Sequence, residues 1–285
     1  MVPFEIWPGP MEGVGSAQFV KTVNHLKLVD RWMTPFLRIS STIPKLKLIE
    51  ELIAPFCVGN VPVTLQIMGN NPSMLETTAK LASKLPIVGI NLNAGCPSKR
   101  VCSNGAGGGL WKNPTQIKEL LLAIKNGAPN LEISLKTRLG FCNPEESYDI
   151  LGNLAQNNAC DKYFIHYRTV EELYNPAPNR IARLQKAVNI LKGYPCIVNG
   201  DINSVEDGIN LLTATSSQGI MCARFWVQDP WLLKRFDANN NAPDSEVGRK
   251  EFFNCFCSFN VPKGAKLEIA KMLWGVKSKE FASLL

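Results

Sequence analysis

The segment "VTLQIMGNNPSMLETTAKLASKLPIVGINL" (residues 63–92) decides the fold, because it reads as a strand, a helix and a strand in succession. Its apolar runs at 63–68 and 88–92 are short and contain β-branched residues, as buried strands do. The stretch between them opens with Asn71-Pro72, which is a helix start signal. Two strands joined by a helix predict a parallel βαβ unit.

The same alternation continues along most of the chain. Helical patterns separate most of the apolar runs, so the eight predicted strands within about 235 residues fit a (β/α)8 TIM barrel better than an open doubly wound sheet. No glycine-rich dinucleotide fingerprint follows the first strand, which runs into "PGPMEGVGS". The six further strands are predicted at residues 4–7, 33–37, 132–139, 163–167, 196–199 and 219–223, and the other helices of this region at 113–127, 143–158, 178–193 and 204–214.

The last part of the chain has a different character. A polar connector, "DANNNAPDSEVGR" (237–249), is followed by helical patterns at 250–261 and 262–285. We therefore predict two domains, a TIM barrel over residues 1–236 and a small helical domain over 237–285. The helical domain is rich in lysine, at positions 263, 266, 271, 277 and 279.

Composition narrows the class of protein. The chain has 285 residues, of which 45% are hydrophobic and 19% charged, as in ordinary globular proteins. No apolar run approaches the roughly 20 residues of a membrane span, and the N-terminus lacks the pattern of a signal peptide. These features predict a cytoplasmic protein without a membrane partner. The net charge of +7 favours a polyanionic partner such as nucleic acid.

The cysteines predict neither a disulfide framework nor a metal site. Nine are present, an odd number at irregular spacing, and no CxxC pair occurs. The pair Cys255 and Cys257 has no second pair or nearby histidine that would complete a tetrahedral site.

Polar residues recur where the predicted strands end, which in a barrel is the edge that carries the active site. Any one of them can be a core residue satisfied by the protein itself. Their recurrence on successive strands instead favours one bound polar ligand that supplies partners for all of them. Amides and a lysine suit the carbonyls and ring nitrogens of a flavin. The residues are Gln66, Asn91, Asn93, Cys96, Lys136, Arg138, His166, Arg168, Asn199, Asp201 and Arg224.

Cys96 stands out within "GINLNAGCPSKRVCSNGAGGG" (89–109), where it lies between Gly95 and Pro97 just past a strand. Three interpretations are open from the residues alone: a small buried hydrophobe, a metal ligand, or a reactive thiol that faces a ligand.

Several segments together resemble the tRNA-dihydrouridine synthases, which are flavin enzymes that reduce uridines in the D-loop of tRNA. The resemblance runs from about residue 8 to 236 and is most specific at the GCPS segment with its trailing glycines. It is most similar to the bacterial subclass that modifies uridine 16. The matching segments are "PMEGV" (10–14), "LQIMG" (65–69), "NLNAGCPSKRV" (91–101), "GAGGGLWKNP" (105–114), "LKTRLG" (135–140), "IHYRT" (165–169), "VNGDI" (198–202) and "MCAR" (221–224).

The resemblance implies FMN as cofactor, NADPH as reductant and tRNA as partner. It implies that Asn93 and Arg168 lie toward the target base, and that Lys99 and Arg100 contact tRNA phosphates. No metal and no protein partner is inferred from the sequence. The implied cofactor-binding residues are Pro10, Met11, Gln66, Lys136, His166, Asn199, Gly200, Asp201, Ala223 and Arg224.

The chemistry of the family gives Cys96 a role. Hydride from the reduced flavin adds at C6 of the uracil, and a proton must then reach C5 from the opposite face. A protonated thiol on a loop can be that general acid. The glycines at 105 and 107–109 are expected to allow close approach of the RNA backbone.

Two alternatives stay open at this point. One is a flavoenzyme that reduces a free pyrimidine. The other is a tRNA-binding homologue with weakened or lost catalysis, which is suggested by Ala223 in place of the usual glycine, by Tyr167 at a normally small position and by the short C-terminal domain.

Overall fold

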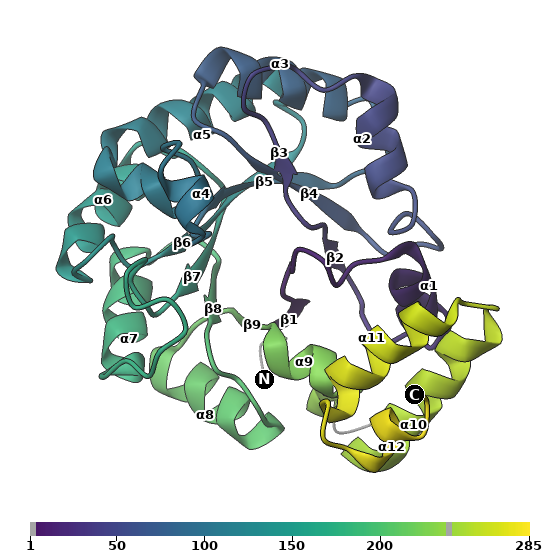
Figure 1. The fold of residues 1–285 in the computed structure, drawn as a ribbon. Coiled ribbons are helices and arrows are strands. Elements are labelled where there is room, and N and C mark those ends of the chain that lie inside the picture. Colours follow the sequence, from purple (N-terminus) through teal and green to yellow (C-terminus); the bar gives the residue numbers. More distant parts are fainter. Residues whose placement is uncertain (1–3, 238–240) are drawn as a thin grey trace.

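The computed structural model describes residues 4–237 and 241–285, and its centre is a ring of parallel strands surrounded by helices (Figure 1). The hydrogen-bonded order is β1-β9-β8-β7-β6-β5-β4-β2, with β3 also paired to β4. The first and last strands of this order, β1 and β2, are in contact but not hydrogen-bonded as a pair, so the ring is nearly closed. The strands are β1 (Glu5–Pro8), β2 (Trp32–Met33), β3 (Leu37–Arg38), β4 (Val63–Met68), β5 (Gly89–Ala94), β6 (Glu132–Arg138), β7 (Lys162–His166), β8 (Cys196–Asn199) and β9 (Gly219–Cys222).

The prediction of a (β/α)8 barrel is confirmed, with one local difference. The strand expected at 33–37 is divided into β2 and β3 around Pro35, which has no N–H for a strand ladder. The hydroxyl of Thr34 also replaces a backbone acceptor, since it accepts the N–H of Gln66 at 3.0 Å.

The helices follow the expected start signals. The side chain of Asn71 accepts the backbone N–H of Met74 at 3.0 Å, and that of Ser204 accepts the N–H of Asp207 at 3.0 Å. The helices around the barrel are α1 (Ala17–His25), α2 (Leu46–Ile53), α3 (Pro72–Ala82), α4 (Lys99–Cys102), α5 (Thr115–Gly127), α6 (Glu145–Gln156), α7 (Arg180–Ile190), α8 (Val205–Thr215) and α9 (Arg224–Gln228), with 3-10 turns η1 (Gly107–Lys112) and η2 (Lys234–Phe236).

The C-terminal helices lie outside the ring beside α1 (Figure 1). They are α10 (Ser245–Ser258), α11 (Lys263–Trp274) and α12 (Lys279–Ala282), so the segment expected as one helix at 262–285 is divided at Gly275, whose φ is +83°. Phe252 of α10 contacts Phe19 of α1, with 5.4 Å between ring centroids, and belongs to the same apolar cluster as the barrel core. The division into two domains stays a prediction.

Five buried side chains fill part of the barrel interior and belong to β1, β2, β7, β8 and β9. The rings of Trp7 and Phe164 meet edge to face at 4.9 Å, as aromatic pairs prefer. Met221 is shared between this cluster and the cavity described below, so the apolar layer forms part of the cavity floor. The five are Trp7, Met33, Phe164, Ile197 and Met221.

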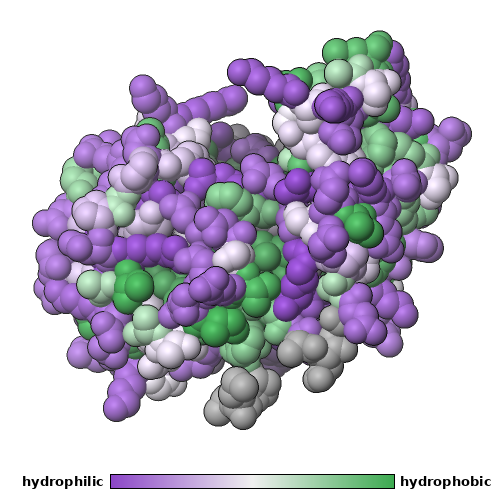
Figure 2. Space-filling model, turned by 90° about the horizontal axis from the view of Figure 1, so that it is seen from below, coloured by the Kyte–Doolittle hydropathy of each residue, from purple (hydrophilic) through white to green (hydrophobic). Residues whose placement is uncertain are grey.

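Hydrophilic side chains cover most of the face shown in Figure 2. Among the helices of the described residues, none combines the length and apolarity that crossing a membrane requires.

Candidate active site

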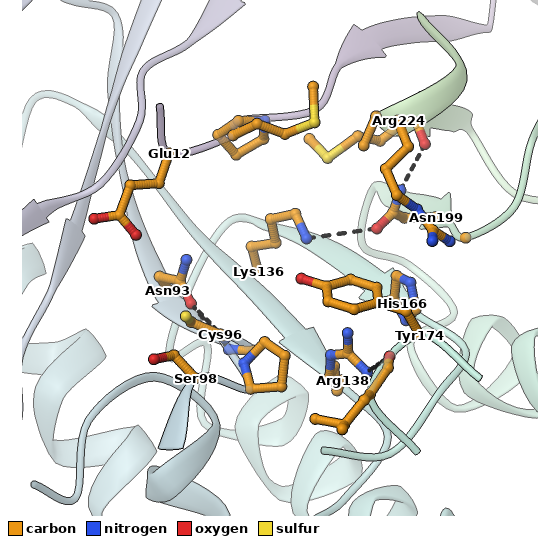
Figure 3. Close-up of a pocket in the computed structure, with 18 of the residues that line it drawn as sticks. Glu12, Asn93, Cys96, Ser98, Lys136, Arg138, His166, Tyr174, Asn199 and Arg224 are labelled. Carbon is orange, nitrogen blue, oxygen red and sulfur yellow. Dashed lines mark hydrogen bonds between the residues drawn. The ribbon is translucent and has the colours of Figure 1, made fainter. Parts of the chain in front are cut away.

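A cavity of about 650 Å³ opens at the carboxyl ends of the strands, a volume within the usual range for small-molecule sites. Lys136 lies across its middle, with Cys96 on one side and His166, Asn199 and Arg224 on the other (Figure 3). Thirteen of the predicted site residues line it: Pro10, Met11, Asn93, Cys96, Lys99, Lys136, Arg138, His166, Asn199, Gly200, Asp201, Ala223 and Arg224.

Four predicted site residues do not line this cavity. Gln66 and Asn91 are buried, Arg168 is buried and pairs with Asp201, and Arg100 is exposed on α4. Their positions in the sequence indicated the region of the site, but not the direction of each side chain.

The Cys96 loop is held by Asn93. The Oδ1 atom of Asn93 accepts the backbone N–H groups of Gly95 and Cys96, each at 3.0 Å, while its Nδ2 donates to Gln66 Oε1 at 2.9 Å. The loop therefore turns around an amide that is itself fixed from the barrel interior. This arrangement leaves the half-buried Cys96 thiol on the cavity wall.

The glycines after Cys96 are used inside the protein. A Cβ on Gly107 would lie 3.1 Å from Cys96 Cβ, and one on Gly108 would lie 2.9 Å from the Cys96 carbonyl oxygen. Gly107, Gly108 and Gly109 are buried. The expectation that these three glycines admit the RNA backbone was wrong, because the space that their missing side chains leave is filled by the Cys96 loop, α4 and Val170.

Lys136 is the unusual charge of the site. Its Nζ reaches Asn199 Oδ1 at 3.5 Å, and no ion pair is recorded for it within residues 4–237 and 241–285. Burial, reinforced by the charge of Arg138, lowers the pKa of Lys136 from 10.5 to about 8. The ammonium thus faces the cavity with no carboxylate of the described residues within ion-pair distance.

The buried amides next to Lys136 satisfy one another. Gln66 Nε2 donates to Asn91 Oδ1 at 2.8 Å, and Asn91 Nδ2 donates to Ser134 Oγ at 2.9 Å. A ligand is therefore not required to satisfy Gln66 or Asn91, contrary to the expectation for these strand residues. The network instead extends through Asn93 to the Cys96 loop.

His166 presents a neutral imidazole. Burial and the charges of Arg138 and Lys136 hold its pKa well below the ordinary value. Its Nδ1 accepts the backbone N–H of Arg168 at 3.2 Å, so the proton of the neutral ring is assigned to Nε2. His166 lines the cavity, and its Nε2 lies 3.3 Å from where a Cβ on Gly200, another cavity residue, would stand.

Asp201 lies at the centre of an ionic cluster. Its carboxylate accepts from Tyr167 Oη at 2.8 Å, from Arg224 at 2.7 Å and from both terminal nitrogens of Arg168. Burial raises the pKa of Asp201, but the hydrogen bonds from Arg168 and Tyr167 and the nearby positive charges outweigh it, so the pKa lies below its ordinary value. Arg168 also donates to the Asn175 carbonyl at 2.6 Å, so its guanidinium is engaged by the protein.

Tyr167 and Ala223, the two residues that differ from those usual in the resembled family, each pack against a glycine. Gly200 has a φ of +125°, and a Cβ there would lie 2.5 Å from the ring of Tyr167. A Cβ on Gly9 would lie 2.6 Å from that of Ala223. Tyr167 is buried and does not line the cavity, so its ring takes no space from a ligand there.

Reasoning from the sequence missed Tyr174. This side chain lines the cavity and is 57% exposed. The guanidinium carbons of Arg138 and Arg224 lie 5.4 and 5.0 Å from its ring centroid, within the range of cation–π contacts. Tyr174 is in the loop after β7, where no strand pattern points to it, although Arg138 fixes the loop by donating to the carbonyls of Thr169 and Leu173 at 2.8 and 2.7 Å.

These residues fit a flavin mononucleotide. An ammonium without a carboxylate and a neutral imidazole N–H suit acceptor-rich ring and chain atoms. Met11, Phe36 and Met221 add apolar surface to the wall. Among the described residues, no group of three His, Cys, Asp or Glu side chains is arranged to hold a metal ion.

A TIM barrel with a thiol, an ammonium and a neutral imidazole around one cavity at the carboxyl ends of its strands is typical of a barrel enzyme. The chain belongs to the dihydrouridine synthase family, whose sequence model matches residues 9–261. The resemblance noted from the motifs is thereby confirmed.

Curated relatives include proteins named tRNA-dihydrouridine(16) synthase. That of Vibrio vulnificus is 30% identical over 225 residues, which cover 76% of this chain and 69% of the relative. That of Vibrio parahaemolyticus is 28% identical over 222 residues, covering 76% and 68%. A tRNA-dihydrouridine synthase B of Pseudomonas aeruginosa is 27% identical over 242 residues, covering 83% and 70%.

Solved structures support the fold alone. A variant of NCR from Zymomonas mobilis has a TM-score of 0.57 at 14% identity, covering 84% of this chain and 87% of that one. An aldolase, QR15, has a TM-score of 0.54 at 11% identity, covering 82% and 95%.

Proposed function

We propose that this protein is an FMN-dependent tRNA-dihydrouridine synthase that uses NADPH to reduce one D-loop uridine, at position 16, to 5,6-dihydrouridine. Members of its family reduce uridine to dihydrouridine in tRNA, and the relatives that specify a position name 16. The observation that carries the proposal is that Cys96 and Lys136, from different strand ends, line one cavity.

The residues that would hold FMN are those of the cavity wall. Lys136 and His166 would donate to acceptor atoms of the cofactor, and the segments 199–201 and 223–224 would lie by its phosphate. Pro10 and Met11 would support the ring. When bound and reduced, FMN supplies the hydride that C6 of a uracil accepts.

Cys96 would hold the proton that C5 takes up. The loop that carries the thiol is fixed at two backbone N–H groups by Asn93 and closely packed by Gly107, so its position is set before a substrate binds. A positioned general acid of this kind contributes roughly 100- to 10,000-fold in rate. Lys136 offers a positive charge to stabilise negative charge that develops in the cavity.

Binding to tRNA would use the positive charge of the chain. The net charge is +7, and Lys99 and Arg100 are exposed on α4, where Lys99 lines the cavity. A uridine in a folded D-loop must leave its stack to enter the cavity. We place this activity in the cytoplasm, where tRNA is modified.

The test is a map of dihydrouridine in tRNA from cells that lack the gene. Complementation with the wild-type gene is expected to restore dihydrouridine at position 16, and Cys96→Ala is expected to leave it absent. Cys222→Ala, which removes a buried thiol outside the cavity, is the matched control and is expected to restore the modification.

Three outcomes would overturn the proposal. Unchanged dihydrouridine at every tRNA position in the deletion strain would show that tRNA is not the substrate. Turnover of free uridine or uridine monophosphate by the purified protein, without turnover of tRNA, would favour the small-molecule flavoenzyme instead. A protein that binds tRNA but takes up no flavin would be the binding homologue.

A further inference from the structure

A second cavity of about 520 Å³ adjoins the first one. The two share Tyr174, Asp201, Arg224 and Phe225 as a common wall. Beyond that wall the second cavity is lined by residues of the loop after β7, by the start of α7 and by α9. Of its residues outside that wall, Arg180, Asn203 and Gln228 have been given no role above.

The second cavity carries an excess of positive charge. Three guanidinium groups line it, those of Arg168, Arg180 and Arg224. Two carboxylates oppose them, since Asp201 pairs with Arg168 and Arg224, and Asp207 pairs with Arg180 at 3.1 Å. One positive charge is left over. A guanidinium with free N–H groups binds phosphate well, and Arg224 is recorded with one hydrogen bond in the described part of the chain.

Aromatic and amide groups complete the wall. Tyr174 is 57% exposed and Phe225 is half-buried, so both offer ring surface. The exposed side-chain amides of Asn203 and Gln228 have no recorded hydrogen bond among residues 4–237 and 241–285. Rings that stack, amides that pair with base edges and guanidinium groups that bind phosphate are together the chemistry of a nucleotide site.

We infer that the second cavity holds a nucleotide, namely the one that neighbours the target uridine in the RNA chain. The inference rests on the proposed function. A uridine that enters the first cavity breaks its stacking with its neighbour, which then needs a new partner. Because the two cavities share a wall, the second one lies where such a neighbour can be held. The nucleotide half of NADPH has the same chemistry, and the experiment separates the two sources.

The test compares Arg180→Gln with Asp207→Asn in the full-length FMN-loaded protein. Both variants break the same ion pair, but only the first removes a positive charge from the second cavity. We expect Arg180→Gln to raise the Kd for an unmodified tRNA transcript about tenfold. The slope of log Kd against the logarithm of the salt concentration is expected to decrease by about one. Asp207→Asn is expected to change this Kd less than threefold. The Kd for NADP+ is expected to stay unchanged in both.

Other outcomes have defined meanings. If Arg180→Gln weakens NADP+ binding and spares tRNA, the nucleotide comes from the reductant and the RNA source is refuted. If Arg180→Gln matches either the wild type or Asp207→Asn with both probes, the site itself is refuted. Should Arg180→Gln fail to fold, Gln228→Ala, an exposed change, carries the test with an expected threefold loss for tRNA. Wild-type protein that forms no dihydrouridine refutes the proposed function instead.

Discussion

Replacing Lys136 by methionine is expected to stabilise the flavin-free protein at neutral pH. The pKa of Lys136 is lowered from 10.5 to about 8 in the folded state, chiefly by burial. Each tenfold change in proton affinity is worth about 1.4 kcal/mol, so the buried charge costs roughly 3 kcal/mol. Methionine keeps the long apolar stem and removes that cost.

The pH dependence has a definite sign. Between pH 8 and 10.5 the unfolded chain binds more protons at this lysine than the folded chain, so the stability of the wild type rises with pH across this window. The gain from Lys136→Met should therefore be largest at pH 7, at roughly 2–3 kcal/mol, and should shrink as the pH approaches 10.5.

The assay is urea unfolding of flavin-free wild type and variant at pH 7 and at pH 9.5, followed by circular dichroism. Lys162→Met is the matched control, because Lys162 is a buried lysine of the barrel strands that pairs with Glu132 at 2.9 Å and Glu5 at 3.3 Å. The control is expected to lower the free energy of unfolding by roughly 2 kcal/mol. This is less than the loss on breaking a fully buried ion pair, because both carboxylates are partly exposed. A Lys136→Met protein that is less stable than the wild type at pH 7 would refute the reasoning.

Further predictions concern the Cys96 loop. Gly107→Ala is expected to lower the free energy of unfolding by about 2 kcal/mol, because φ is +54° and the new Cβ would lie 2.7 Å from Val101 Cγ1. The thermal midpoint and the single-turnover rate should both fall. An unchanged midpoint would contradict the prediction. Its control, Gly264→Ala in α11, meets no atom within 4 Å and is expected to gain about 0.5 kcal/mol. Asn93→Ala leaves two N–H groups of the loop without an acceptor, so it is expected to lower the free energy of unfolding by about 2 kcal/mol and to remove most activity. Asn70→Ala removes an exposed hydrogen bond to the Asn104 carbonyl and should lower it by under about 0.5 kcal/mol.

The barrel was predictable because its signals are local. Alternating apolar runs and helix start signals such as Asn71-Pro72 act over a few residues, and the structure has a strand or helix wherever they are strongest. The division of the strand at 33–37 depended on Pro35, whose effect on a ladder is also local. The break of the C-terminal segment at Gly275 likewise follows from one residue with positive φ.

The site was predictable only in part because side-chain direction depends on tertiary neighbours. Gln66 lies within β4 and Arg168 follows β7, yet Gln66 donates to the amide of Asn91 and Arg168 pairs with Asp201. Strand periodicity does not contain those partners. Tyr174 was missed for the related reason that a loop residue reaches the cavity only when Arg138 fixes its loop.

Single-turnover reduction of a tRNA transcript by the purified, FMN-loaded protein tests the proton-donor role of residue 96 most directly. Dihydrouridine would be counted by mass spectrometry for the wild type, Cys96→Ala and Cys102→Ala, the last of which removes the neighbouring half-buried thiol. We expect Cys96→Ala to slow the reaction at least about 100-fold with flavin spectrum and tRNA affinity intact, and Cys102→Ala to react at the wild-type rate. A Cys96→Ala enzyme that matches the wild type would show that another group delivers the proton.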